Sequence, residues 1–309
     1  MLMLKKTIAA LSLLSILAAC QNDENPSQPE PKPRQDINLT RAEQEFMDKG
    51  TDFAFRFFDQ VCSTEKEKPN VFVSPLSASL CLSMITNGAT DNTLAEMQDV
   101  LGFPANTFSL DDLNNYNQKL TSALLDLDNT TQLGIANSIW IEEGFKVYDS
   151  FVDVNKKMYD AQVQELDFTS PTAKDVINQW CATQTNNCIK EVIQEIPADA
   201  RMYLINALYF KGIWKSQFDK SATGQDNFTN VDGSQQKVAM MNQTATFNYT
   251  QTDDFSIAEL PYGNEAFSMV ILLPSGDKTL DESLPSLNYE NWKQWSKNMV
   301  GKELQIKLP

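Results

Sequence analysis

Apolar residues recur with two different periods along this chain, and the change of period separates a helical first part from a strand-rich second part. From Thr40 to Asp59 the apolar residues, among them Phe46, Phe53 and Phe57, return at helical spacing and predict an amphipathic helix. Ser74 followed by Pro75 is a favourable helix start, and the helix after it is apolar nearly all round, which predicts burial. Further helices are predicted over Thr93–Gly102 (opened by a Thr93/Glu96 capping box), Leu110–Leu127, Tyr148–Tyr159 and Ser170–Thr185.

Strand patterns interrupt these helices and then dominate the second part. The predicted strands are Gln132–Glu142, Val163–Phe168, Arg201–Lys211, Gln236–Met241, Thr246–Thr250, Ile257–Pro261, Phe267–Pro274 and Glu303–Leu308, with two short helices over Leu280–Leu284 and Tyr289–Asn298. Because helices come first and no strand–helix alternation follows, the pattern predicts an α+β fold. With no repeats and no linker after residue 36, we expect a single domain over residues 36–309.

One predicted strand carries an amide in the middle of an apolar run. Asn206 lies within Leu204–Trp214, and burying an amide is costly unless it is hydrogen-bonded. We therefore expect a polar partner elsewhere in the chain. The simpler alternative is a core strand that contains one satisfied asparagine.

The first nineteen residues have the pattern of an export signal. Two lysines precede an apolar core, Ile8–Leu17, that is too short for a stable membrane span. Small residues lead directly to Cys20, as at a bacterial lipoprotein processing site, so we expect a lipid on Cys20; the alternative is an ordinary secretory signal that contains a cysteine. Residues 20–35, with four prolines, predict a flexible tether. The expected location is the bacterial cell envelope, either the outer membrane or the cell surface.

Charge and composition exclude several functions. Without residues 1–19 the chain has 23 basic and 41 acidic side chains, which argues against nucleic acid as a partner. It has no histidine, which removes His-dependent nucleophilic triads and histidine metal sites. No carboxylate pair has a persuasive spacing, so we expect no catalytic residues, no metal and no cofactor.

Four cysteines follow Cys20: Cys62, Cys81, Cys181 and Cys188. A Cys181–Cys188 disulfide is conceivable in an exported protein, and buried free thiols are an equally good interpretation.

A series of spaced motifs resembles one known family, the serpins, which are serine protease inhibitors. The matching stretches are Asn70–Ser77, Gly88–Phe103, Ala136–Trp140, Asn206–Trp214, Asp232–Met241 and Pro261–Pro274. The resemblance covers about residues 40–309. It implies a serpin fold with a helical cluster and sheets A, B and C.

The resemblance also implies roles for particular residues. Ser74, Ser77 and Asn206 match a cluster under the centre of sheet A, called the shutter, where the serines would be the partners of Asn206. Trp214 matches an indole at the top of sheet A, the breach. The implied mechanism is that a protease cleaves an exposed reactive loop, becomes acylated and is carried along as the loop inserts into sheet A. Proteases, serine-type or cysteine-type, are thus the implied partners.

The sequence ends at Leu308-Pro309, which matches the end of strand 2C in the family. The family's strands 6A and 5A, its reactive loop and its last strands would follow this point. We therefore expect a fragment of a longer serpin that lacks the reactive-site bond, with a naturally truncated product as the alternative.

Three functions remain to be compared. The first is a surface lipoprotein that traps proteases when complete. The second is a non-inhibitory binding or structural lipoprotein on the same scaffold. The third is a Ser–Lys hydrolase that uses Ser74 or another serine with a nearby lysine. It is disfavoured because no lysine stands three residues after Ser74.

Overall fold

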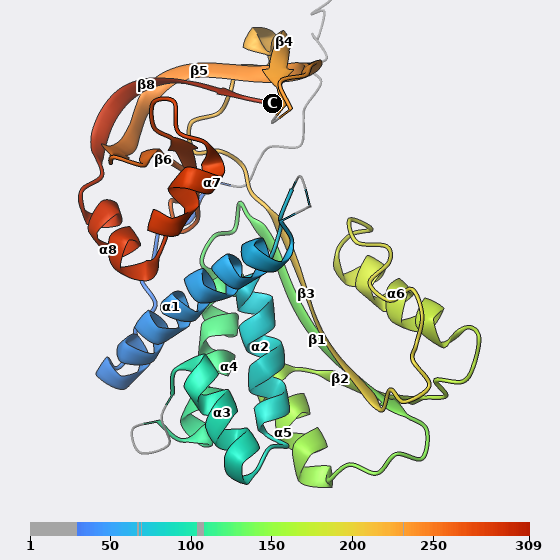
Figure 1. The fold of residues 1–309 in the computed structure, drawn as a ribbon. Helices are drawn as coiled ribbons and strands as arrows, with labels where there is room; N and C mark the ends of the chain where they lie inside the picture. The colour runs from blue at the N-terminus through green and yellow to red at the C-terminus, as the bar shows by residue number, and fades with distance from the viewer. Residues whose placement is uncertain (1–29, 67, 69, 104–107, 231) are drawn as a thin grey trace, which may run out of the picture.

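A cluster of helices and two β-sheets make up the part of the chain that the computed structural model describes, namely residues 30–66, 68, 70–103, 108–230 and 232–309 (Figure 1). The expected signal and Cys20 lie outside the described residues. None of the described helices is both long enough and apolar enough to cross a membrane.

Five helices form the cluster: α1 (Arg41–Thr64), α2 (Pro75–Thr86), α3 (Asp91–Leu101), α4 (Leu110–Asp126) and α5 (Asp149–Tyr159). Thr40 begins α1 with a capping box, in which its hydroxyl accepts from Glu43 N and the Glu43 carboxylate accepts from Thr40 N. α2 lies in the centre of the cluster, and Leu80 and Met84 are almost completely buried on it. This burial confirms the prediction from its all-round apolar sequence.

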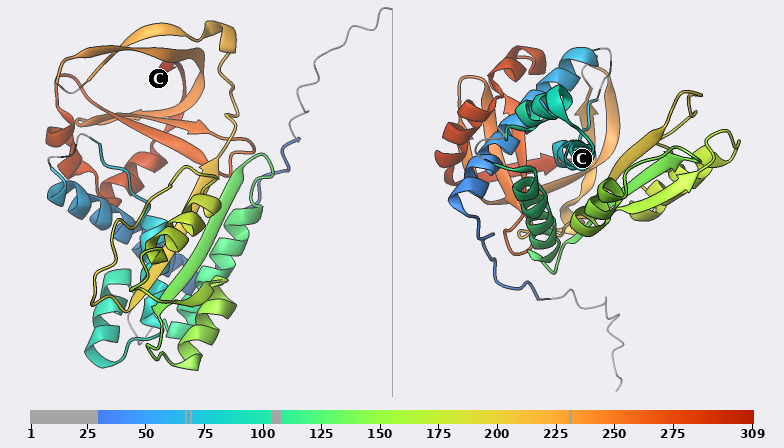
Figure 2. Two further views of the ribbon diagram at one scale, coloured as in Figure 1. Left: turned by 90° about the vertical axis from the view of Figure 1, so that its right-hand side faces the viewer. Right: turned by 90° about the horizontal axis from the view of Figure 1, so that it is seen from below.

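The first sheet has the order β2 (Gln162–Leu166), β1 (Gln132–Glu142) and β3 (Met202–Lys211). β1 pairs parallel with β2 and antiparallel with β3 over ten residue pairs. One face of the sheet packs on α2 and α5, and the other packs on α6 (Ala173–Gln184), which crosses it (Figures 1 and 2). Both faces are therefore buried, which explains the nearly continuous apolar sequence of β1 and β3.

The second sheet contains β4 (Gly224–Thr229), β5 (Gln235–Gln251), β6 (Phe255–Pro261), β7 (Ser268–Pro274) and β8 (Val300–Leu308). The long β5 pairs with β4 through residues 235–240, and with β8 and β6 further on. The short elements η1 (Lys220–Ala222), α7 (Leu280–Ser283), η2 (Leu284–Ser286) and α8 (Tyr289–Lys297) connect these strands. α8 contacts α1 through the rings of Trp292 and Phe55.

Four local predictions differ from the structure. α3 begins at Asp91 rather than Thr93, and no side-chain hydrogen bond caps it, so the predicted Thr93/Glu96 capping box is wrong. α6 begins at Ala173 rather than at the predicted Ser170-Pro171 start, because residues 170–172 form a turn before the helix. The two strands predicted over residues 236–250 are one, because β8 pairs with the polar residues between them. β4 was not predicted, since Gly224–Thr229 has little strand propensity and is held by pairing with β5.

A buried carboxylate joins the helical part to the second sheet. Asp128, in the loop between α4 and β1, is 4% exposed and accepts hydrogen bonds from Thr130 N, the hydroxyls of Thr130 and Thr131, and Asn264 N in the β6–β7 turn. Burial alone would raise the pKa of Asp128, but these hydrogen bonds outweigh it and lower the pKa. The carboxylate therefore stays charged and fixes the turn.

The N-terminal segment binds at the same junction. Lys32 N donates to Asn129 Oδ1 at 2.8 Å, and the side-chain amide of Asn264 donates to the carbonyls of Lys32 and Leu127. The carbonyl of Glu30 accepts from Asn129 Nδ2. Part of the segment predicted as a tether is thus attached to the folded body.

We predict that Gly263→Ala destabilises the protein by about 3 kcal/mol, because Gly263 has φ +31° and a Cβ there would stand 2.3 Å from Asp128 Oδ2. Urea unfolding at neutral pH measures this change in the free energy of unfolding. Gly144→Ala is the matched control: Gly144 also has positive φ, at +79°, but open space around it, so its cost should be only about 1 kcal/mol. Equal effects of the two substitutions would contradict the role given to the junction.

Candidate functional site

The predicted shutter serines lie together at the first turn of α2. Ser74 is the N-cap, and its hydroxyl oxygen accepts from Ser77 N at 3.2 Å. The two hydroxyls are 2.8 Å apart and hydrogen-bonded to each other. Both side chains are partly buried. The helix start predicted from Ser74-Pro75 is confirmed, and the pair of hydroxyls forms a small polar group beside the sheet.

Asn206 has a different partner from the serines predicted for it. Its side-chain amide donates to Asn137 Oδ1 of β1 at 2.8 Å, and the two residues stand directly opposite each other in the β1–β3 register. Asn137 Nδ2 in turn donates to the carbonyl of Tyr159. Within the described residues no hydrogen bond joins Asn206 to Ser74 or Ser77, and Asn206 Oδ1 is buried without any donor.

β3 is an edge strand within the described part of the chain. It pairs with β1 along one side only, while α2 packs beneath it. The Cys81 thiol on α2 lies 3.9 Å from the carbonyl oxygen of Leu204. The unpartnered oxygen of Asn206 is therefore placed in the middle of a strand whose second side is available for pairing.

Trp214 lies beyond the end of β3, where the chain passes from the first sheet to the second. Its indole stacks on Tyr262 at 4.4 Å between ring centroids, with Phe218 against it edge-on. An isolated bridge pairs Trp214 with Tyr262, and Gly212 allows the approach because a Cβ there would lie 2.7 Å from the Tyr262 ring. Trp214 thus holds the end of β3 against the β6–β7 hairpin.

A comparison with protein families identifies this arrangement. The model of the family described as "Serpin (serine protease inhibitor)" matches residues 48–309. The chain belongs to the serpin family. A serpin-like protein of the archaeon Methanosarcina acetivorans is 35% identical over 231 residues, which are 73% of this chain and 54% of that protein. Mouse antithrombin-III is 30% identical over 264 residues, covering 83% of this chain and 57% of the relative. The chain therefore spans little more than half the length of these relatives.

Solved serpin structures share the fold. The thermophilic serpin tengpin in its latent state superposes with a TM-score of 0.77 and 30% identity, over 89% of this chain and 72% of tengpin. Cleaved human thyroxine-binding globulin gives a TM-score of 0.79 at 23% identity, over 86% of this chain and 79% of that one. The predicted α+β serpin fold is confirmed. The shutter and breach assignments of Ser74, Ser77, Asn206 and Trp214 remain predictions from the family resemblance.

All four cysteines in the described part of this serpin are free. The Cys181–Cys188 disulfide is therefore not formed: Cys181 is buried on α6, on the side that packs against the first sheet, while Cys188 is exposed in the loop after α6. Burial raises the pKa of the Cys81 thiol to about 11, with a backbone hydrogen bond from Asn206 opposing the shift. Cys81 is thus a thiol directly under the candidate shutter.

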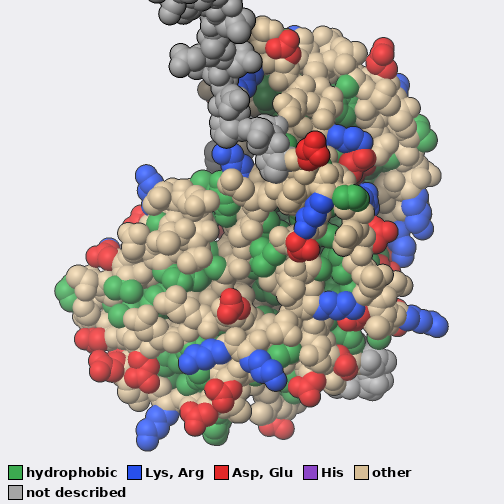
Figure 3. All heavy atoms as spheres, turned by 180° about the vertical axis from the view of Figure 1, so that it is seen from behind, with side chains coloured by type: hydrophobic (Ala, Val, Ile, Leu, Met, Phe, Trp, Pro, Cys, Tyr) green, Lys and Arg blue, Asp and Glu red, His purple; other side chains and the backbone are tan. Residues whose placement is uncertain are grey.

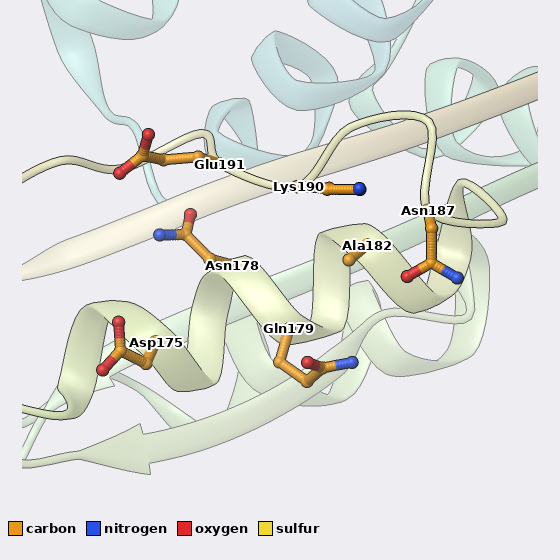
Figure 4. A pocket seen from close by; sticks show the side chains of 7 residues that line it. All are labelled: Asp175, Asn178, Gln179, Ala182, Asn187, Lys190 and Glu191. Carbon is orange, nitrogen blue, oxygen red and sulfur yellow. The ribbon is translucent and has the colours of Figure 1, made fainter.

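Two of the hollows on the surface of the described residues differ in character. One, of about 410 Å³, lies between α6 and the loop after it and is lined by polar residues (Figure 4). Asn178 holds that loop, since its oxygen accepts from Val192 N and Ile193 N and its amide donates to the Ile193 carbonyl. The other, of about 350 Å³, is apolar and lies between α1 and residues 71–75.

Charged side chains are mixed on the face seen in Figure 3, where acidic and basic groups alternate and hydrophobic side chains show between them. In the described ranges no three His, Cys, Asp or Glu side chains are grouped as a metal site would require.

Two contributors to the site were missed from sequence. Asn137 could have been found, because it is the one amide within the central apolar run of its predicted strand, as Asn206 is in its own. Asp128 carried no such signal: its role depends on a contact with Asn264, which is 136 residues away.

We predict that Cys81 reacts with a soluble thiol reagent at pH 8 at least about 100-fold more slowly than Cys188, because it is buried and its pKa is about 11. Mass spectrometry of peptides from timed labelling reactions measures both rates in one sample. Cys188→Ser should remove the fast phase and leave the slow one. Rapid labelling of Cys81 in the folded protein would contradict the packing of α2 under β3.

Proposed function

We propose that this serpin is an inhibitor of serine-type endopeptidases, and of cysteine-type ones as a further class, by loop insertion into sheet A. On this proposal the chain forms the body of the inhibitor and contains the sheet into which a reactive loop inserts. It is not an enzyme and uses no cofactor. Its partner is the protease that attacks the loop.

The observation that carries the proposal is the match of residues 48–309 to the serpin family. Within the described residues β3 lies at the edge of the first sheet, and the Asn206 oxygen at its centre has no donor. An unpaired strand edge accepts an added strand through main-chain hydrogen bonds. A buried acceptor without a donor costs about 1–3 kcal/mol, so an incoming strand that supplied a donor would gain stability there.

The junction around Trp214 supports the same mechanism. A strand that enters beside β3 from this end would have to pass the stacked rings of Trp214 and Tyr262. The Asp128–Asn264 contact holds the hairpin that carries Tyr262. These contacts would resist opening until loop insertion supplies more stabilisation than they do.

We also propose that the protein is a lipoprotein of the bacterial cell envelope, exported and anchored through a lipid on Cys20 at the outer membrane or cell surface. The support is the sequence of residues 1–20 alone. In that position the inhibitor would meet proteases that reach the cell from outside.

The inhibitory proposal predicts an SDS-stable complex. The product of the complete gene is incubated with trypsin-, chymotrypsin-, elastase- and papain-like proteases, and denaturing gels show whether a covalent band of combined mass forms. A protease inactivated with a serine- or cysteine-directed reagent is the control and should form none. Cleavage by active proteases without any stable complex would overturn the inhibitory proposal in favour of a non-inhibitory binding or structural role.

The anchoring proposal predicts that cells fed an alkyne fatty acid incorporate it into this protein. Cys20→Ala should abolish the label and release the protein from the membrane fraction, because acyl-chain burial provides the attachment. Cys188→Ala is the matched control and should remain labelled. Labelling that survives Cys20→Ala would contradict the assignment of the lipid to that residue.

A further inference from the structure

We infer that Tyr159 and Asn114 are positioning residues for the centre of the first sheet (β2, β1 and β3): they hold the Asn137–Asn206 pair in place from the side of the helical cluster. Only the significance given to Asn206 depends on the proposed function. The contacts that carry the inference are hydrogen bonds within the described residues.

The carbonyl of Tyr159 is the contact between the helices and the pair. Tyr159 is the last residue of α5, and the chain turns sharply after it because Asp160 has φ +49°. Carbonyls in the last turn of a helix have no partner within that helix. The Tyr159 carbonyl is therefore free to accept from Asn137 Nδ2, at 2.8 Å. Any shift of this helix end moves the acceptor that orients Asn137.

The side chain of Tyr159 ties that helix end to α4. Its hydroxyl donates to Asn114 Oδ1 at 2.7 Å and accepts from Asn117 Nδ2 at 3.2 Å. All three side chains are buried, at 2–5% exposure. Burial raises the pKa of Tyr159 to about 12, so the hydroxyl remains a donor at every physiological pH.

Asn114 passes the connection on to α2. Its amide donates to Asn87 Oδ1 at 2.8 Å, and Asn87 Nδ2 donates back to Asn114 Oδ1 at 3.1 Å and to the Ser83 carbonyl. A continuous set of hydrogen bonds thus runs from the end of α2 through α4 and α5 to β1 and β3. In a buried set of this kind, removing one member weakens its neighbours.

The set ends at the oxygen of Asn206, one of two buried side-chain oxygens in the described residues that have no hydrogen-bond partner. Because Asn137 accepts from Asn206 while donating to Tyr159, its amide orientation is fixed at both ends. Asn206 must therefore donate from its side-chain nitrogen to Asn137, and this orientation leaves its side-chain oxygen without a donor. Tyr159 and Asn114 preserve this orientation without touching Asn206 themselves.

The test is hydrogen exchange of the purified 309-residue chain carrying Tyr159→Phe, with Tyr116→Phe as the matched control. Tyr116 is equally buried at 5%, lies on α4 and has a pKa likewise raised by burial to about 12, but it is outside this set of hydrogen bonds. We expect Tyr159→Phe to accelerate exchange in β1 and β3 about fivefold relative to β5 and β8, the effect of one lost buried hydrogen bond. Tyr116→Phe should leave that ratio unchanged.

Asn114→Ala is the second variant should Tyr159→Phe fail to fold, and the same ratio is expected to rise in it. In a sample with labelled asparagine, the side-chain amide signals of Asn206 should also shift in Tyr159→Phe but not in Tyr116→Phe. Uniform acceleration across both sheets, or changes confined to α4 and α5, would overturn the inference. Since no protease is present, this outcome is independent of whether the protein proves to be an inhibitor.

Discussion

The hydrogen bond between the side chains of Asn137 and Asn206 is the contact on which the rest of the candidate site depends. It places two amides opposite each other on adjacent strands, on the face of the sheet that packs against α2. Burying two side-chain amides costs little only when their nitrogen and oxygen atoms are hydrogen-bonded. In this pair every such atom except Asn206 Oδ1 has a hydrogen-bond partner. The remaining oxygen gives β3 an unpaired polar atom at its centre.

Much of the fold could be predicted from the sequence, because its signals are local. Ser74-Pro75 predicted the start of α2, Gly102 the end of α3, and the apolar run of Gln132–Glu142 the whole of β1. The errors occurred where tertiary contacts override local preference. The polar residues in the middle of β5 are in a strand only because β8 pairs with them, and Thr93 is not a cap because the helix already begins at Asp91.

The candidate site was predictable in its residues but not in its pairing. Asn206 drew attention as an amide within an apolar strand, whereas the shutter and breach roles of Ser74, Ser77 and Trp214 came from the family resemblance and remain predictions. The partner of Asn206 was assigned to the serines, whereas the structure assigns it to Asn137, because antiparallel register decides which side chains face each other. Register depends on the whole β1–β3 ladder, and no short motif contains it. Tyr262 was visible as a motif, but its stacking on Trp214 depends on how two sheets meet.

The attachment of the N-terminal segment at the junction has a consequence for how the protein would stand at a membrane. Lys32 is held against Asn129 and Asn264, close to the end of the first sheet where Trp214 lies. Were Cys20 the lipid-bearing residue, it would stand twelve positions before Lys32, and a fully extended chain of that length spans about 40 Å at most. The junction end of the molecule could then never be further than this from the lipid surface. On the proposed inhibitory function, a protease approaching that end would have to fit between the protein and the membrane, so the size of the enzyme, as well as the sequence it cleaves, would decide which proteases reach it.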